Sequence, residues 1–390
     1  MSVASAAPRA EAGSGFEFLS EDNRMIREAA QRIAREVIEP TAAARDREAR
    51  WPTDELRVLG EQGFMGMLVP QEYGGSGSSF TDYCVAFETF AAADCGLGTI
   101  FHVHNMSHYP IASFGTEEQK RRYLPPGARG ERIGAWLLTE PQAGSDTAAL
   151  RTTARRDGDD YILEGTKQFI SNGSEAGTAM ALAVTDPAAG RRGVTAFIVD
   201  PDSPGFEIAR VEDKMGQRTA HVAQIRLDGV RVPAANILGE LGGGYRIAMS
   251  GLADGRIAIA AQAVGVAQAA LDAAVRYAKE RNAYGKPIFD LQAVSFRLAE
   301  MAAQVAVARQ YYLHAARLLE AGLPCAKEAA IAKLHASEMA ERVCSAALQT
   351  FGGYGYLQDF PVERYCRDVR VCTIYEGTSD IQKLIISRNL

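Results

Sequence analysis

The apolar residues of this chain repeat with two different periods, and this change of period constrains the fold more than any other feature. Near both ends of the chain they recur every three or four residues, whereas between about residues 136 and 232 the pattern is that of short strands. The first spacing is that of one face of an α-helix, and alternation of apolar and polar residues is that of a half-buried β-strand. The 390 residues are enough for two or three domains, at roughly 150 residues each.

The first helical region is predicted to follow a short tail. Residues 1–17 are rich in Ala, Ser and Gly and lack the apolar stretch of a secretory signal, so we expect a disordered tail. Ser20 is a suitable N-cap, and the apolar face behind it is expected to end at Pro40. Further helices are predicted over about 54–61 and 81–93. The apolar face of the first helix consists of Ile26, Ala30, Ile33 and Val37.

The middle region carries the signals of antiparallel strands. Asp157-Gly158 and Asp228-Gly229 are dipeptides that are typical of hairpin turns. The stretch from Ile225 to Asp228 alternates apolar and polar residues, and residues 194–199 form a short apolar run of the kind found in buried strands. This region therefore predicts a β domain.

The C-terminal third is predicted to be a bundle of long helices. Apolar residues from Leu298 to Leu319 step by three and four, and Gly322 and Pro324 follow as stop signals. Another helix is expected from about Lys327 to Gln349, and Gly352-Gly353 would end it.

Composition argues against several kinds of partner. The chain has 42 Lys and Arg against 48 Asp and Glu, a formal net charge of −6, so no basic surplus favours nucleic acid. The most apolar stretch, Ile257–Leu271, is rich in Ala and is interrupted by Gln262 and Gln268, so we expect no membrane-spanning helix. The six cysteines have no CxxC spacing and indicate free thiols. We expect a cytoplasmic protein without nucleic-acid or membrane partners.

Two motif-like segments are not expected to carry chemistry. The segment Gly353–Gln358 begins like a dinucleotide-binding glycine motif, but it lacks the third glycine and follows a predicted helix rather than a strand. His102, His104 and His108 are spaced by two and four residues, which does not place all three on one helix face. No metal site is expected.

Four other segments are candidates for binding and catalysis. The loops Leu138–Asp146 and Gly165–Gly173 gather Gly, Ser and Thr at strand ends, where backbone N–H groups can hold a phosphate and hydroxyls can bond a heterocycle. Ordinary turns explain the same composition. The segment Gln349–Gly355 also fits a helix C-cap and turn. The segment Ile374–Gln382 places Glu376 between Tyr and Gly, where a solvated turn carboxylate is the usual interpretation.

Together these segments resemble the acyl-CoA dehydrogenase family, over about residues 18–390. Leu138–Ala149 is similar to the first signature of the family and Gln349–Asp368 to its second. The sequence from Tyr375 to Thr378 resembles the place where many members hold the catalytic base. The C-terminal half is most similar to short-chain and short branched-chain members. Further similar segments are 70–75, 213–218, 231–233 and 281–285.

The resemblance implies an α+β multidomain fold. It consists of an all-α N-terminal domain, a middle antiparallel β domain and a C-terminal four-helix bundle. We place these domains at 18–135, 136–235 and 236–390, behind the tail at 1–17. The resemblance also implies a homo-oligomer, with a tetramer built from two dimers.

The resemblance further implies a reaction. Family members hold FAD, remove hydrogens from Cα and Cβ of an acyl-CoA thioester to give a trans-2-enoyl-CoA, and pass electrons to an electron-transfer flavoprotein. The Cα–H bond is weakly acidic, so its cleavage needs a base and a polarised carbonyl, while the β-hydrogen leaves as hydride to flavin N5. The match places the base at Glu376, a carboxylate whose pKa a dry site can raise. Some members hold the base on a middle helix, where this chain has Gly255.

The match also assigns contacts residue by residue. Those expected to line the flavin are Trp136, Leu138, Thr139, Gly144, Ser145, Phe169 and Ser171. Those expected to bind the diphosphate and adenine of a neighbouring subunit's FAD are Arg281, Gln292, Gln349, Gly352 and Gly353, and Thr378 and Asp380 resemble further FAD contacts. Expected substrate contacts are Ser145, Asp254, Arg256, Tyr375 and Gly377. A structural ion pair is an equally open interpretation of Arg256.

Two departures from the family pattern concern details of CoA and flavin contacts. The chain has Arg218-Thr-Ala-His221 where the family often has Arg-Gly-Ser-Ser/Thr, and Ala253 stands where an Asp is common, with Asp254 next to it. We expect short straight or α-methyl acyl chains as substrates. The alternatives are a relative that uses its flavin as an oxidase or a desulfinase, and a non-catalytic scaffold that kept the fold.

Overall fold

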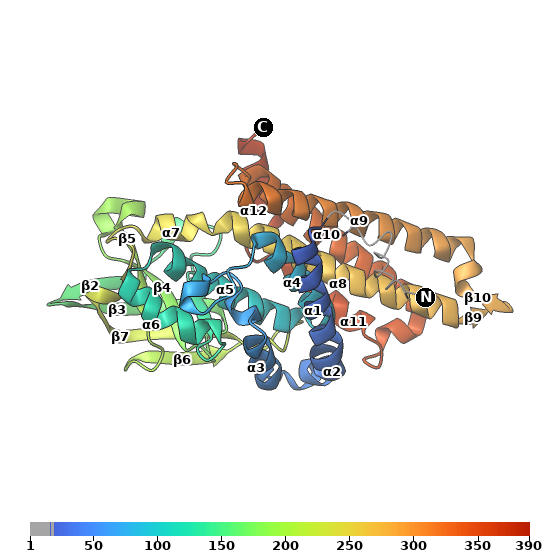
Figure 1. Ribbon diagram of the computed structural model, residues 1–390, viewed down its shortest axis with the longest axis horizontal. Coiled ribbons are helices and arrows are strands. Elements are labelled where there is room, and N and C mark those ends of the chain that lie inside the picture. Colours follow the sequence, from blue (N-terminus) through green and yellow to red (C-terminus); the bar gives the residue numbers. More distant parts are fainter. Residues whose placement is uncertain (1–15, 17–18) are drawn as a thin grey trace, which may run out of the picture.

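The computed structural model describes Phe16 and residues 19–390, so the tail predicted over 1–17 lies outside the described residues apart from Phe16. The described residues form an N-terminal helical domain, a middle β domain and a C-terminal helical domain, which confirms the predicted fold class. Figure 1 shows an elongated molecule with the sheet at one end and the long C-terminal helices extending to the other.

Helix α1 (Glu21–Ile33) begins at the predicted cap. The Ser20 side chain accepts a hydrogen bond from the Asn23 backbone N–H at 3.1 Å, and Asn23 Oδ1 accepts one from the Ser20 backbone at 3.2 Å. The prediction that Pro40 ends the helix is wrong. A π-helical turn (Ala34–Ile38) leads into α2 (Glu39–Glu48), and Pro40 lies in the first turn of α2, where a missing N–H costs no hydrogen bond.

The other N-terminal helices are only partly predicted by the sequence. Helices α3 (Thr53–Glu61) and α4 (Phe80–Ala93) match the expected ranges closely, whereas α5 (Cys95–Phe114) and α6 (Glu117–Ala128) were not expected. Helix α5 is buried on nearly all sides, so its sequence has no polar face and no helical period. Both missed helices also contain proline, which normally argues against a helix interior.

The middle domain is one eight-stranded sheet. Its strands in chain order are β1 (Gly134–Leu137), β2 (Thr153–Asp157), β3 (Asp160–Ser171), β4 (Thr178–Val184), β5 (Val194–Val199), β6 (Phe206–Val211), β7 (Val222–Pro233) and β8 (Ile237–Leu238). The spatial order is β6–β7–β3–β2–β4–β5–β8, with β1 beside β4. The pairing is antiparallel except that β1 runs parallel to β4 and one contact between β2 and β4 is parallel.

One of the two predicted hairpin turns is confirmed. Strands β2 and β3 pair antiparallel across Asp157-Gly158. The second dipeptide, Asp228-Gly229, lies inside β7, where the register against β3 shifts beside Leu163 and Glu164. Gly229 is the extra residue of a β-bulge, with φ of 69°. Because a turn and this kind of bulge both need positive φ, the dipeptide alone does not distinguish them.

The C-terminal domain is built around α8. Its helices are α7 (Gly244–Ser250), α8 (Leu252–Glu280), α9 (Gln292–Glu320), α10 (Ala326–Phe351), α11 (Val362–Val369) and α12 (Ser379–Arg388), and a small hairpin, β9 (Asn282–Ala283) and β10 (Lys286–Pro287), joins α8 to α9. Helix α8 packs against α4, α9 and α10. A β-carbon built at Gly265 would lie 2.2 Å from the Glu88 carbonyl oxygen on α4, so these two helices pack with their backbones in contact.

By length and composition the segment Gly244–Glu280 is apolar enough to cross a membrane. Its most apolar window is nevertheless 83% buried inside the fold, which is the burial of a core helix.

Candidate active site

Glu376 lies in the turn that joins the 3₁₀ segment Arg370–Thr373 to α12. Its φ of 52° is in the left-handed region, which is uncommon for a residue with a side chain. The carboxylate lies over α8: a β-carbon built at Gly255 would be 2.8 Å from Glu376 Oε2 and 3.2 Å from Cδ. A larger residue at position 255 must displace this carboxylate. Glu376, where the sequence predicts the catalytic base, therefore faces Gly255, the position at which some members of the family hold it.

The surroundings of Glu376 raise its affinity for a proton. Burial raises the pKa of this carboxyl, and the positive charges of Arg256 and Lys333 oppose the rise. Arg256 is itself buried, its Nε has no hydrogen-bond partner, and it forms no ion pair with any residue that the structure describes. The ion-pair interpretation of Arg256 therefore finds no partner in the described part of this chain.

Two fully buried side chains bind the backbone at Glu376 and Gly377. Lys333 on α10 donates a hydrogen bond to the Gly377 carbonyl at 2.7 Å. Gln382 on α12 donates to the carbonyls of Glu376 at 3.1 Å and Gly377 at 2.8 Å. Sequence reasoning did not single out Lys333 or Gln382. The available signal for Lys333 was a Lys on a helix face that is otherwise mostly Ala.

Tyr375, the neighbour of the base, belongs to a buried polar network. Its hydroxyl donates to Gln262 Oε1 on α8 and accepts a hydrogen bond from Gln217 Nε2 at 3.2 Å. Gln217 also accepts a hydrogen bond from Thr99 Oγ1 at 2.7 Å, and its backbone N–H donates to Asp368 Oδ1. This network joins side chains from all three domains beside the base.

The two loops predicted to line a flavin lie against each other. The Gln168 backbone N–H on β3 donates to the Thr139 carbonyl at 2.8 Å. Lys167, fully buried, donates to Glu140 Oε1 at 2.8 Å and to the Leu138 carbonyl at 3.3 Å. Although burial alone would raise the pKa of Glu140, the Lys167 ammonium and nearby donors hold it at about 2. Glu140 and Lys167 thus brace the loop from inside, and sequence reasoning missed both.

The predicted flavin-lining residues lie on β1 and β3 and in the loop that follows β1. Trp136 is on β1, Gly144 and Ser145 are in the loop behind it, and Phe169 and Ser171 are on β3. The Phe169 side chain is 66% exposed because the register between β3 and β7 shifts there, and its φ is 58°. An exposed aromatic ring beside polar loops provides a face for stacking a flat heterocycle.

The residues assigned to a neighbouring subunit's FAD lie far from the base. Arg281 follows the end of α8, 26 positions after Gly255, which is about 39 Å along a helix. The Arg281 guanidinium lies over the Tyr354 ring at 5.6 Å, next to Gly352 and Gly353. Gln349 lines a shallow groove of about 490 Å³ together with Arg297, Glu341, Arg342, Ser345 and Ala346. The structure brings the Arg281 side chain to the Gly352–Gly353 turn but not to the base.

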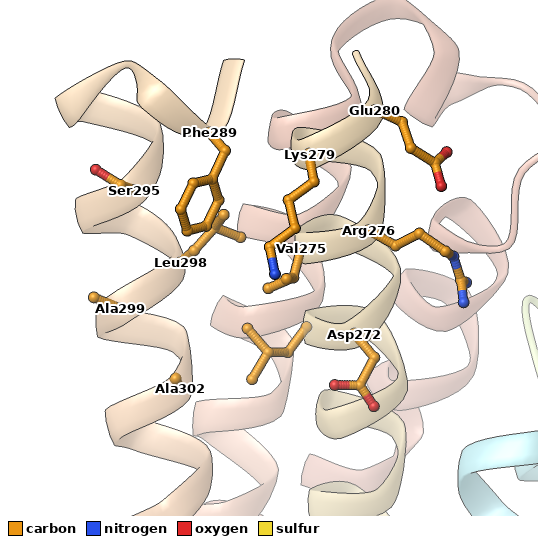
Figure 2. Close-up of a pocket in the computed structure, with 11 residues that line it drawn as sticks. Asp272, Val275, Arg276, Lys279, Glu280, Phe289, Ser295, Leu298, Ala299 and Ala302 are labelled. Atoms are coloured by element: carbon orange, nitrogen blue, oxygen red, sulfur yellow. The ribbon is translucent and has the colours of Figure 1, made fainter. Parts of the chain in front are cut away.

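A larger groove of about 630 Å³ lies between α8 and α9. Figure 2 shows Lys279 and Val275 on α8 facing Phe289 and Leu298, with the Lys279 ammonium over the Phe289 ring at 5.5 Å. Leu271, the lining residue nearest to Gly255 in the sequence, is 16 positions away, which is about 24 Å along the helix. This groove is therefore separate from the base.

The three histidines of α5 are buried structural residues. His104 Nε2 lies 3.0 Å from the carbonyl oxygens of Met65 and Gly127, and His102 Nδ1 lies 2.7 Å from the Tyr83 hydroxyl. No cluster of three metal-ligating side chains occurs among residues 19–390.

Comparisons with known families cover nearly the whole chain. The acyl-CoA dehydrogenase N-terminal domain matches residues 20–131, the middle domain matches 135–230 and the C-terminal domain matches 242–390. The fold and these matches define an oxidoreductase that acts on a CH–CH bond. The chain belongs to the acyl-CoA dehydrogenase family, whose members depend on a flavin.

Individual relatives agree with this family. An acyl-CoA dehydrogenase from Bacillus subtilis is 43% identical over 373 residues, covering 95% of this chain and 98% of the relative. The mitochondrial short-chain specific acyl-CoA dehydrogenase of Mus musculus is 42% identical over 373 residues, covering 95% of this chain and 90% of the relative.

Solved structures share the fold closely. A structure described with the electron transferring flavoprotein of Acidaminococcus fermentans superposes with a TM-score of 0.94 at 44% identity, covering 95% and 98% of the two chains. The butyryl-CoA dehydrogenase of Megasphaera elsdenii gives 0.93 at 38% identity, with the same coverage. A glutaryl-CoA dehydrogenase of Mycobacterium smegmatis in complex with FADH2 gives 0.90 at 30% identity, covering 95% of each chain.

Asp254, in the first turn of α8, yields a test of the electrostatics beside the base. Burial raises the pKa of Asp254 to about 6. Between about pH 4 and pH 6 the folded protein therefore holds a proton that the unfolded chain has already lost. The stabilisation is complete below about pH 4 and is lost as the pH rises through about 6. We predict that Asp254→Asn becomes more stable relative to wild type by about 3 kcal/mol between pH 4 and pH 7.5, an order-of-magnitude figure from the difference in pKa.

The measurement is thermal or urea unfolding of both proteins across this pH range. The matched control is Asp290→Asn, which removes an exposed carboxylate at the other end of the domain and should show no such trend. A constant stability difference for Asp254→Asn from pH 4 to 7.5 contradicts the burial argument.

Proposed function

We propose that this acyl-CoA dehydrogenase uses FAD to convert short or short branched acyl-CoA thioesters to trans-2-enoyl-CoA, with Glu376 as the base. The observation that carries the proposal is the Glu376 carboxylate lying over the bare Cα of Gly255, in a buried setting that raises its pKa.

The geometry gives Glu376 the properties that α-proton removal requires. A thioester Cα–H is only weakly acidic, so a base of ordinary carboxylate strength would be poor, and burial strengthens it. The positive charges of Arg256 and Lys333 oppose this rise in pKa and so favour the ionised, proton-accepting form of the carboxyl. In this proposal Tyr375 and Gly377 flank the substrate, and the Glu376 backbone N–H holds the thioester oxygen as negative charge develops there.

The chain's residues fit a bound FAD. β-Carbons built at Gly144, Gly352 and Gly353 meet no atom within 4 Å, so the backbone there is open to a ligand. Thr139 and Ser145 add hydroxyls, Phe169 adds an exposed ring, and Thr378 and Asp380 begin α12 beside the base. When bound, FAD supplies a hydride acceptor, N5 of its flavin, that no side chain provides.

The polar network beside Tyr375 supports a short acyl chain. Gly255 and Gln262 are seven residues apart on one face of α8, which is about 10 Å along the helix axis. Gln262, fully buried, is held there by Tyr375 and by a 2.7 Å hydrogen bond to Thr99 Oγ1. Pushing a long apolar chain through these paired groups would leave them without partners, at a cost that a short chain avoids. The short-chain relative supports the same range.

Two copies of the chain are proposed to complete the cofactor site. Arg281, Gln292 and Gln349–Gly353 are too far from the base to reach the same FAD within one chain, so a neighbouring subunit would supply them. A tetramer of two such dimers follows from the family. The solved structure described with an electron transferring flavoprotein supports such a protein as the electron acceptor.

The acyl-chain prediction is tested with a panel of acyl-CoAs and a dye acceptor. Butyryl-CoA and 2-methylbutyryl-CoA should give higher kcat/KM than dodecanoyl-CoA. Gln262→Ala should narrow the ratio of butyryl-CoA to dodecanoyl-CoA kcat/KM at least about tenfold, because it removes a buried amide that a long chain would leave without a partner. The control is Gln268→Ala, which makes the same change at a half-buried place on α8. A wild-type preference for dodecanoyl-CoA would overturn the substrate assignment, and rapid oxygen consumption without the dye would indicate an oxidase.

The cofactor prediction is tested on the purified protein itself. It should be yellow and release an equimolar amount of FAD on heating, and its smallest flavin-loaded species in light scattering should be a dimer. Arg281→Ala should lower FAD affinity while leaving the Tm of the apoprotein unchanged. Released FMN, a colourless protein after reconstitution with FAD, or an active flavin-loaded monomer would each contradict this part of the proposal.

A further inference from the structure

The turn that carries Glu376 is held by an ammonium group that the proposed reaction does not otherwise use. Lys333 is 0% exposed, on the face of α10 that packs into the core, and its Nζ lies 2.7 Å from the Gly377 carbonyl oxygen. A buried Lys costs free energy unless its charge meets a partner. The Lys333 ammonium donates a hydrogen bond to the Gly377 carbonyl. The residue before Gly377 is Glu376, whose carboxylate carries the opposite charge.

The backbone at this turn also needs support. Glu376 has φ of 52° and Gly377 has φ of 89°, so two consecutive residues are left-handed. A residue with a side chain is strained in this region and persists there only where its surroundings hold it. Gln382 from α12 binds both carbonyls of this turn, and Lys333 from α10 binds that of Gly377.

We propose that Lys333 is a positioning residue for the base, which binds the Gly377 carbonyl so that the Glu376 carboxylate stays over Gly255 and which supplies a fixed positive charge beside that carboxylate. The proposal rests on the function proposed for Glu376. Lys333 does not touch the substrate in this role; it acts through the backbone and through its charge.

The charge of Lys333 is present at neutral pH. Burial lowers its pKa to about 8, and the neighbouring Cys372 and Glu376 oppose that fall. The charged and titratable groups around the Lys333–Glu376 pair are Arg256 and Asp254 on α8, Cys372 in the 3₁₀ segment, Glu338 on α10 and Tyr83 on α4. Arg256 is the other cation that favours ionised Glu376, so removal of Lys333 weakens this effect without abolishing it.

Three substitutions separate the two parts of this role. Lys333→Gln can keep a hydrogen bond to the Gly377 carbonyl but loses the charge, Lys333→Arg keeps the charge, and Lys333→Met loses both. The matched control is Lys383→Met on α12. Lys383 is exposed, follows Gln382 in the sequence, and has its Nζ 3.8 Å from Glu338 Oε1.

The kinetic readout is flavin reduction by butyryl-CoA in stopped flow between pH 5 and 9. Loss of the charge should raise the pKa of Glu376, so the acid limb of the rate profile should move up by about one pH unit in Lys333→Gln, with a plateau near that of wild type. Lys333→Met should show the same limb and a plateau at least about tenfold lower, because Gln382 alone then holds the turn and the carboxylate is positioned less precisely. Lys333→Arg and Lys383→Met should keep the limb of wild type.

The second readout does not depend on activity. Unfolding of Lys333→Gln, Glu376→Gln and the double variant should show coupling of the two side chains at pH 7 that weakens as the pH falls and Glu376 takes up a proton. If the two side chains are coupled but Glu376→Gln has no kinetic effect, Lys333 and Glu376 interact and the function proposed for Glu376 is wrong.

Unchanged limbs in both Lys333→Gln and Lys333→Met, with no pH-dependent coupling, would overturn the positioning role and leave Lys333 as a structural residue. If Lys333→Met fails to fold, the limb of Lys333→Gln and the coupling measurement decide the matter.

Discussion

The contact between the Glu376 carboxylate and the bare Cα of Gly255 is the constraint on which the rest of the site depends. With 2.8 Å between Oε2 and the place of a β-carbon, any larger residue at position 255 would move the Glu376 carboxylate. The turn must also hold Glu376 in a left-handed conformation, which explains why two buried side chains bind its carbonyls. Gly255 and the turn come from segments over one hundred positions apart, so only the packed C-terminal domain brings them together.

Buried hydrogen bonds between the domains keep this contact in register with the loops predicted to line a flavin. Gln217 of the middle domain reaches Thr99 of the N-terminal domain and Tyr375 of the C-terminal domain. Each of these polar groups is costly when it loses its partner, so the network resists displacement of one domain against the others. Within the middle domain, Lys167 and Glu140 hold the loop that begins at Leu138. The site is thus built by polar pairs inside an Ala-rich core.

The sequence predicts the parts of this arrangement that are local. The Ser20 cap, the long helices and the hairpin at Asp157-Gly158 follow from spacing and turn chemistry. Helix α5 could not be predicted because burial on all sides removes its period, and Pro40 misled because a proline is tolerated in a first turn. Lys333, Gln217 and Lys167 were not predicted because their hydrogen-bond partners are distant in the sequence. Gln382 was not predicted because its side chain binds backbone carbonyls, which any residue of a turn could offer. Glu376 was found through resemblance to a family signature, since a lone carboxylate in a turn otherwise has the pattern of an ordinary surface residue.

The most direct test of the central claim is the rate of flavin reduction in Glu376→Gln, measured by stopped flow with butyryl-CoA. The substitution keeps the size of the side chain and removes the proton acceptor. We predict unchanged FAD content, near-normal binding of a substrate analogue, and a rate lower by at least about 10³. The loss should fall on kcat rather than on binding, because proton abstraction belongs to the transition state. A rate within about tenfold of wild type would contradict the assignment of Glu376 and mean that another residue is the base.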